Sequence, residues 1–134
     1  MKKQIDVVGA VIVRDGLILC AQRGPGSLPG MWEFPGGKIE PGEAPQTALQ
    51  REVDEELRCE VAVGEHVATT TFEYDFGVVT LTTYYCDLLW GEPVLTEHAE
   101  VRWLAPADLF EVEWAPADVP AVEKIQADYA VHVD

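Results

Sequence analysis

Residues 36–57 read GGKIEPGEAPQTALQREVDEEL, and the spacing within this stretch is the most informative in the chain. Pro45 can occupy the first turn of a helix, where its missing N–H group is not needed. Downstream of it, Leu49, Val53 and Leu57 recur every four residues, as on one face of a helix. The stretch therefore predicts a helix from Pro45 to Leu57 that buries a narrow apolar stripe.

Three glutamates lie beside that stripe. Glu52, Glu55 and Glu56 follow the i, i+3, i+4 spacing that places side chains on one helical face. Like charges at this spacing repel one another, so the cluster marks either a solvated face or a site for a hard divalent cation. Ligands that are all oxygen favour Mg²⁺, Mn²⁺ or Ca²⁺ over zinc. The three glutamates alone leave both interpretations open.

The wider spacing resembles the signature of the Nudix hydrolases. Gly37 is followed after five residues by Glu43, and after seven more by REVDEE at 51–56. The preceding WEFPGGK at 32–38 is similar to the MutT branch of that family, which handles nucleoside triphosphates. The resemblance implies an α/β fold, the Nudix α/β/α sandwich around a central mixed β-sheet. It also implies that residues 1–134 form a single Nudix domain.

The same resemblance implies roles around a metal site. Glu52 and Glu56 bind the metal most directly, and Glu55 binds it or deprotonates a water. A backbone carbonyl at Gly37 acts as a further ligand, and Glu43 supports the site from its loop. Glu52 is our first choice for the general base. The expected cofactor is Mg²⁺, with Mn²⁺ as a substitute.

Two arginines in and just after the predicted helix are expected to act structurally. Arg51 is one turn from Glu55 and can reach Glu43, so we expect it to orient carboxylates rather than to contact substrate. Arg58 stands where the family usually has glycine, at a helix end that favours left-handed backbone. Either Arg58 adopts that conformation at a modest cost, or the helix ends differently.

The loop before the last predicted strand carries one more candidate. Glu97 lies six residues before Trp103, where MutT-like enzymes have a glutamate that reaches over to a metal-bound water. The alternative is an exposed loop acid. His98 and His66 have no metal-like spacing, and we expect them at the surface or in cross-strand pairs.

Charge limits the partners. The chain has 9 Lys and Arg against 24 Asp and Glu, a formal net charge of −15, whereas nucleic acids and anionic membranes need cationic partners. A small polyphosphate is compatible with this charge if a metal ion neutralises the repulsion. The resemblance places Arg23 near the nucleotide, Lys38 near the phosphates and Glu33 among the substrate-binding residues. For both cations the alternative is a solvated surface charge.

The segment WAPADVP at 114–120 bears on the base. It resembles the base-contacting segment of MutT-type enzymes, in the Ala-Pro-Ala-Asp form of bacterial CTP pyrophosphohydrolases. An ionised Asp118 only accepts hydrogen bonds, which suits the exocyclic amine of cytosine. Its alternative role is a helix N-cap.

The resemblance therefore leads us to expect a nucleoside triphosphate pyrophosphohydrolase that releases a nucleoside monophosphate and pyrophosphate. A cytosine nucleotide, ordinary or modified, is the expected substrate, and 8-oxo-dGTP is the alternative. A binding module without catalysis is disfavoured, because such a module has no need of Glu52, Glu55 and Glu56 together.

The rest of the chain predicts a sheet. Asp15-Gly16 between two apolar runs indicates an antiparallel hairpin. The expected strands cover 5–13, 17–21, 32–34, 59–63, 66–74, 78–89 and 101–104, and a second helix covers 120–129. No run approaches the roughly 18 apolar residues of a membrane span, and the first residues do not resemble a signal peptide. We expect a cytoplasmic protein without nucleic-acid or membrane partners, as a monomer or weak homodimer.

Overall fold

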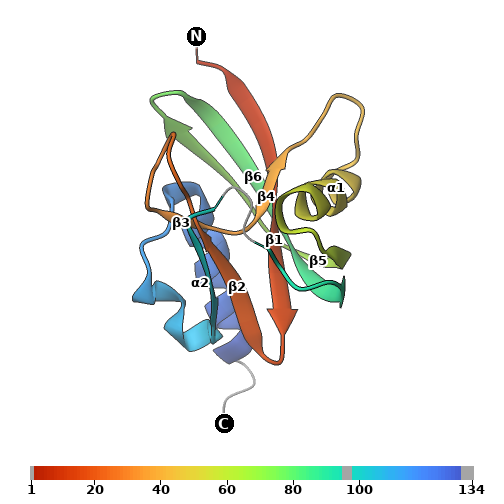
Figure 1. The fold of residues 1–134 in the computed structure, drawn as a ribbon. Coiled ribbons are helices and arrows are strands. Elements are labelled where there is room, and N and C mark those ends of the chain that lie inside the picture. Colours follow the sequence, from red (N-terminus) through yellow and green to blue (C-terminus); the bar gives the residue numbers. More distant parts are fainter. Residues whose placement is uncertain (1, 95–97, 131–134) are drawn as a thin grey trace.

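A mixed sheet lies between two helices in the computed structural model, which describes residues 2–94 and 98–130 (Figure 1). The strands are β1 (Gln4–Arg14), β2 (Leu17–Gln22), β3 (Trp32–Glu33), β4 (Gly36–Lys38), β5 (Glu60–Tyr74), β6 (Gly77–Trp90) and β7 (Glu100–Leu104). The helices are α1 (Pro45–Leu57) and α2 (Val119–Ala130), and the 3-10 helices η1 (Pro106–Glu111) and η2 (Pro116–Asp118) precede α2.

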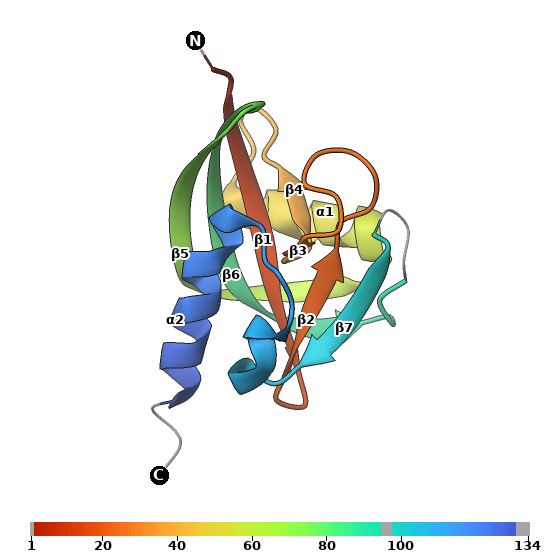
Figure 2. The same cartoon turned by 90° about the vertical axis from the view of Figure 1, so that its left-hand side faces the viewer.

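Strand β1 is the axis of the sheet. It pairs in parallel with β6 and antiparallel with β2 and β4. Strand β5 pairs with β6, while β3 and β7 both pair with β2, all antiparallel. Figure 2 shows β7 alongside β2 on one side of the molecule and β5 alongside β6 on the other. The predicted mixed sheet is confirmed.

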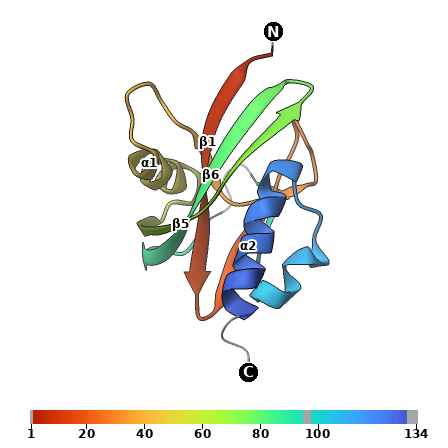
Figure 3. The same cartoon turned by 180° about the vertical axis from the view of Figure 1, so that it is seen from behind.

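The alternation of side chains along the strands builds two cores. In β1, Val8, Ala10 and Ile12 pack in the cluster that contains the buried residues of α1, whereas Val11 packs in the cluster that contains those of α2. Successive residues of a strand point to opposite faces, so one strand serves both layers. The two helices accordingly cover opposite faces of the sheet (Figures 1 and 3). This is the α/β/α sandwich expected from the sequence.

The structure confirms the hairpin and both helices. The β1–β2 turn places Asp15 and Gly16 at φ angles of 53° and 78°, as a tight hairpin turn requires. Helix α1 begins at Pro45 and ends at Leu57, as predicted. Arg58 follows it at φ 56° and ψ 38°, so the first of the two expected alternatives holds, with a non-glycine residue in the left-handed region.

The sequence prediction was wrong at two places in the sheet. The two strands expected at 59–63 and 66–74 form one strand, β5, because its ladder with β6 continues through register shifts around Val63 and His66. Such bulges accommodate extra residues without ending a strand. Strand β4 was not expected, because Gly36 and Gly37 have no side chains to produce a strand pattern. Their backbones nevertheless pair with Gly9 and Val8.

The three cysteines, Cys20, Cys59 and Cys86, are buried free thiols. Burial raises the pKa of Cys20 and of Cys86 to about 12, which keeps both thiols protonated and unreactive at neutral pH. Across residues 2–94 and 98–130, no helix has both the length and the apolar composition needed to cross a membrane.

Candidate active site

Helix α1 presents its glutamates next to the residues that anchor it. Leu49, Val53 and Leu57 are fully buried against the sheet, which fixes the rotation of the helix. Glu52 then lies at the margin of the buried surface with 17% of its side chain exposed, whereas 58% of the Glu55 side chain is exposed. We call Glu52, Glu55 and Glu56 the glutamate face.

Arg51 joins this face to the preceding loop. Its guanidinium donates from Nε and Nη2 to the two carboxylate oxygens of Glu43, both at 2.9 Å. Its Nη1 donates to Glu52 at 2.8 Å and to Glu55 at 3.4 Å. The expected contacts of Arg51 with Glu43 and Glu55 are therefore present. These hydrogen bonds lower the pKa of Glu43 to about 2, so Glu43 remains a carboxylate partner of Arg51 at any physiological pH.

Strand β4 lies directly against the glutamate face. The Gly36 N–H donates to Glu56 Oε1 at 3.0 Å, and Arg51 Nη2 donates to the Lys38 carbonyl at 3.1 Å. A Cβ atom on Gly37 would collide with the Glu52 carboxylate, and one on Gly36 would collide with the Val8 carbonyl. Gly36 is thus required by a close approach of backbone, and Gly37 leaves room for the Glu52 carboxylate to lie against its backbone.

The electrostatics of Glu56 suit a cation. Burial, together with nearby Glu33 and Glu52, raises the pKa of Glu56 to about 8, against the opposing effects of His98 and the Gly36 N–H. A carboxylate destabilised in this way gains most from a neighbouring positive charge. Together with oxygen-only donors and the backbone of Gly37, this donor set fits a hard divalent cation.

The carboxylates are not already gathered around one point. No group of three or more His, Cys, Asp or Glu residues is arranged as a metal site within residues 2–94 and 98–130. Glu52 is turned towards Arg51, and Glu56 is turned towards the Gly36 N–H. Glu97, the loop candidate for this site, lies outside the described residues.

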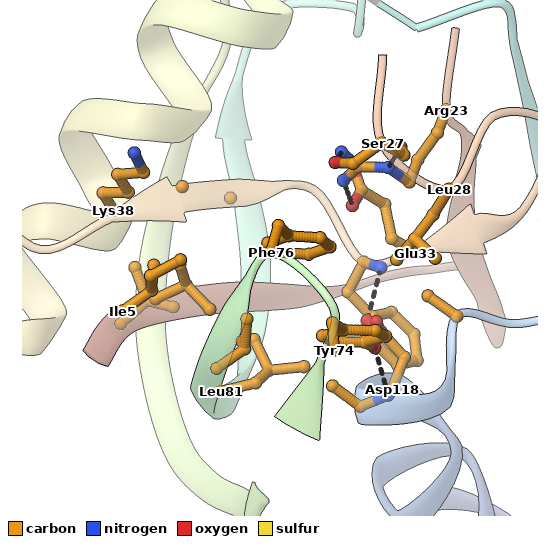
Figure 4. Close-up of a pocket in the computed structure, with 18 of the residues that line it drawn as sticks. Ile5, Arg23, Ser27, Leu28, Glu33, Lys38, Tyr74, Phe76, Leu81 and Asp118 are labelled. Carbon is orange, nitrogen blue, oxygen red and sulfur yellow. Dashed lines mark hydrogen bonds and ion pairs between the residues drawn. The ribbon is translucent and has the colours of Figure 1, made fainter. Parts of the chain in front are cut away.

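A cavity of about 360 Å³ adjoins this region (Figure 4). At one end it is lined by Gly36, Gly37, Lys38 and Glu56. Its other end, which we call the nucleoside end, is lined by polar, aromatic and aliphatic groups from several segments: Arg23, Ser27, Leu28, Glu33, Phe34, Tyr74, Phe76 and Asp118. The structure therefore brings all three predicted substrate-binding residues from outside the Nudix signature, Arg23, Glu33 and Asp118, into the same cavity as the Nudix residues.

Asp118 sits deep at the nucleoside end, with 6% of its surface exposed. Its Oδ1 accepts a hydrogen bond from the Phe34 N–H at 3.1 Å. Burial raises the pKa of Asp118 well above its ordinary value, and nearby Glu33 acts in the same direction. Burial therefore favours the protonated carboxyl, which can donate as well as accept a hydrogen bond, over the ionised acceptor expected from the sequence.

Aromatic residues of the β5–β6 hairpin complete this end of the cavity. The Tyr74 hydroxyl accepts a hydrogen bond from the Ala117 N–H at 2.8 Å, which ties η2 to the sheet next to Asp118. The Phe76 ring stacks on the Tyr74 ring with centroids 5.0 Å apart and planes 6° apart, yet Phe76 is 46% exposed. Figure 4 shows the Tyr74 ring beside Asp118 and the Phe76 ring on the side towards Lys38. Phe76 was not among the predicted site residues, because a hairpin-tip aromatic carries no motif.

Arg23 and Glu33 form an ion pair with 2.5 Å between Nη1 and Oε1. The other Glu33 oxygen lies 2.9 Å from Nε2 of His98, whose side chain is only 3% exposed. The expectation that His98 is a surface or cross-strand residue was therefore wrong. The residue after it lies against the end of β2, where the Ala99 N–H donates to the Gln22 carbonyl at 2.9 Å. No signal in the sequence marked this long-range contact.

Comparisons with known proteins identify similar chains. The NUDIX domain family matches residues 3–125. The chain is 41% identical over 126 residues to the CTP pyrophosphohydrolase of Escherichia coli, with 93% of each chain covered. It is 32% identical over 128 residues to the 8-oxo-dGTP diphosphatase of Haemophilus influenzae, covering 93% of this chain and 94% of that protein.

A solved structure is similar over nearly the whole length. It is the solution structure of a MutT protein of the Nudix hydrolase family from methicillin-resistant Staphylococcus aureus. The two chains are 55% identical, with a TM-score of 0.79, covering 96% of this chain and 99% of the other.

Proposed function

Since this chain belongs to the NUDIX family and is a Nudix hydrolase, we propose that it is a Mg²⁺-dependent nucleoside triphosphate pyrophosphohydrolase. Nudix hydrolases generally use divalent metal ions and act on small nucleotide substrates. The proposed reaction adds water to a nucleoside triphosphate and releases a nucleoside monophosphate and pyrophosphate.

One observation carries this proposal: a single cavity runs from Asp118 to Lys38, Gly37 and Glu56. A nucleoside triphosphate has the same two-ended character, with a hydrogen-bonding aromatic base at one end and anionic phosphates at the other. Apolar and aromatic walls around a few polar groups are typical of such ligand pockets. The cavity thus offers a base site and a phosphate site in one volume.

The residues of α1 would serve the phosphate end. Glu52, Glu55 and Glu56, with the Gly37 carbonyl and Glu97, would hold the divalent ion. When bound, that ion supplies positive charge to phosphate oxygens and makes water more acidic. Our first choice for the group that accepts the proton from the attacking water is Glu52.

Arg51 and Lys38 would support that end of the substrate. Arg51 holds Glu52 through one hydrogen bond and Glu43 through two, and so fixes the direction of the Glu52 carboxylate. Lys38 lies on the wall of the cavity near the expected phosphates. Its positive charge there would offset part of the repulsion between the phosphates and the acidic protein.

A cytosine nucleotide is the proposed substrate. The Phe34 N–H occupies Oδ1 of Asp118, which leaves Oδ2 for the base. An ionised Asp118 accepts a hydrogen bond from the exocyclic amine of cytosine, and that bond in turn stabilises the ionised form. The similarity to a CTP pyrophosphohydrolase supports this choice.

A specific observation also favours 8-oxo-dGTP as a second candidate. The raised pKa of Asp118 makes its protonated form accessible, and a protonated Oδ2 can donate to the O6 oxygen of 8-oxoguanine. The similarity to an 8-oxo-dGTP diphosphatase supports this alternative.

A turnover screen of ordinary and oxidised nucleoside triphosphates with Mg²⁺ tests the proposal. We expect equal amounts of monophosphate and pyrophosphate, a highest kcat/KM for CTP or dCTP, and complete loss of activity in EDTA. Glu123→Gln, an exposed acid on α2, is the matched control and should be fully active. Release of single phosphates, activity in EDTA or no turnover of any triphosphate would contradict the proposed function.

A further inference from the structure

A chain of polar contacts links three segments behind the nucleoside end. Arg23 follows β2, Glu33 ends β3, and His98 precedes β7. Arg23 Nη1 contacts Glu33 Oε1 at 2.5 Å, and His98 Nε2 contacts Glu33 Oε2 at 2.9 Å. Each oxygen of the Glu33 carboxylate is therefore engaged by a different segment.

The direction of these bonds follows from the chemistry of the partners. A carboxylate only accepts hydrogen bonds, and a guanidinium only donates them. His98 therefore donates its Nε2–H to Glu33, and Arg23 donates to the opposite oxygen. Held from both sides, the Glu33 side chain loses the rotational freedom that a solvated glutamate keeps.

His98 differs from its two partners in its access to ligand. Arg23 and Glu33 line the cavity, whereas His98 is absent from the described lining and its side chain is almost fully buried. Its effect on a ligand would therefore pass through Glu33. The bond between the Ala99 N–H and the Gln22 carbonyl fixes the backbone that carries His98 beside the start of the Arg23 loop.

The loop that carries Arg23 is held by its own hydrogen bonds and by short strands. Between β2 and β3, Arg23 is held by backbone bonds to Met31 and Gly30 and by side-chain bonds from its guanidinium to Ser27. Strand β3 itself has only two residues. Its two residues pair with Gln22 and Ala21 of β2, and the Glu33 side chain adds a second connection, through His98, to the segment that leads into β7.

We propose that His98 is a positioning residue for the nucleotide: it fixes Glu33, and through Glu33 the guanidinium of Arg23, at the nucleoside end of the cavity. This inference rests on the proposed function, since it takes the nucleotide to be the ligand of that end.

Kinetics of paired variants test the proposal. His98→Leu fills the space without a donor and should raise KM about 10- to 100-fold while kcat stays within about threefold, because a hydrogen bond to a charged group is lost in substrate binding. His98→Gln retains an N–H donor near the position of Nε2 and should restore most of the affinity. His66→Leu, at the exposed histidine on β5, is the matched control and should behave as the native protein.

A double-mutant cycle separates positioning from a merely structural role. In a Glu33→Ala background the additional change His98→Leu should have almost no effect on KM, because the group through which His98 acts is gone. An equal KM effect in both backgrounds would overturn the proposal. A rise in KM as large in His98→Gln as in His98→Leu would also overturn it. So would a fall in kcat with no change in KM, because that result would point to the influence of His98 on Glu56 instead.

A spectroscopic measurement needs no turnover. In metal-free protein labelled with ¹⁵N-histidine, the His98 Nε2–H should give a proton signal protected from solvent exchange in the native chain and in His66→Leu. The signal should shift and exchange rapidly in Glu33→Ala. If no triphosphate is hydrolysed but this signal behaves as expected, the proposed function fails while the contact stands. An unprotected signal in the native chain would overturn the positioning role itself.

Discussion

The two ends of the cavity are built in different ways. The end next to the glutamate face comes from residues 36–57, which form the short strand β4, one loop and helix α1. The nucleoside end is assembled from the segments that carry Arg23, Glu33, Tyr74 and Asp118, which are up to 95 positions apart in the sequence (118 − 23 = 95). Local spacing fixes the first end, whereas only the folded chain creates the second. The first should therefore govern the reaction rate, and the second the choice of substrate.

The largest expected effect is at the glutamate face. Glu52→Gln keeps the shape of the side chain and removes its charge, so kcat should fall by about 10²–10⁵ while the fold is retained. The control Glu123→Gln should keep native kcat. Steady-state assays with Mg²⁺ measure kcat, and circular dichroism verifies that the variants are folded. Native activity in Glu52→Gln would show that the reaction does not need the negative charge of Glu52.

A smaller loss of kcat is expected when the Glu52 carboxylate is moved but keeps its charge. Gly37→Ala places a methyl group where the Glu52 carboxylate lies, so the carboxylate or β4 must shift. A displacement of about 1 Å in a catalytic group can lower kcat by roughly 10²-fold. We expect a loss of about 10- to 100-fold in kcat with little change in the preference among bases. A changed base preference would show that the two ends are not separable.

The nucleoside end should respond in the opposite way. Asp118→Asn supplies an amide that both donates and accepts, so the ratio of kcat/KM should move from dCTP towards 8-oxo-dGTP by about tenfold. The kcat for dCTP should change far less than in Glu52→Gln. Competition assays with both nucleotides measure the ratio, and an unchanged ratio would reduce Asp118 to a structural residue that holds the Phe34 N–H.

Asp118 also makes a pH dependence testable. Its pKa is raised above 3.8 in the folded chain, mainly by burial. The stability that this group contributes is therefore complete below about pH 3.8 and is lost as the pH rises through the folded pKa. In urea unfolding, the free energy of unfolding of Asp118→Asn relative to the native chain should increase with pH. A relative stability that is constant between pH 4 and 8 would contradict the raised pKa.

The smallest effect is expected at the end of α1, where the helix leaves the glutamate face. Arg58 is left-handed, and its N–H bonds to the Asp54 carbonyl. Arg58→Gly should raise the free energy of unfolding by about 0.5–1 kcal/mol, because glycine adopts this conformation without a Cβ clash. Thermal or urea unfolding measures this change in the free energy of unfolding, and kcat should stay the same. A clear loss of stability would mean that the Arg58 side chain makes a necessary contact.

The sequence by itself determined where α1 begins and ends, and which of its side chains share a face. Pro45 and the Leu49, Val53, Leu57 stripe set the start and rotation of the helix, and the rotation alone places Glu52, Glu55 and Glu56 on one face. Helical neighbours are a few positions apart, so their juxtaposition is encoded by local spacing. The Asp15-Gly16 turn and the second helix were predictable for the same reason.

Only the tertiary structure decided how the nucleoside end is assembled. His98 reaches Glu33 across 65 positions, and Asp118 reaches the Phe34 N–H across 84. The burial that shifts the pKa of Asp118 and of Glu56 also comes from these long-range contacts. No local pattern encodes which loops meet, because that depends on sheet pairing and packing. The sequence therefore determined helix α1 and its glutamate face, and the fold decided the surroundings of Asp118 and His98.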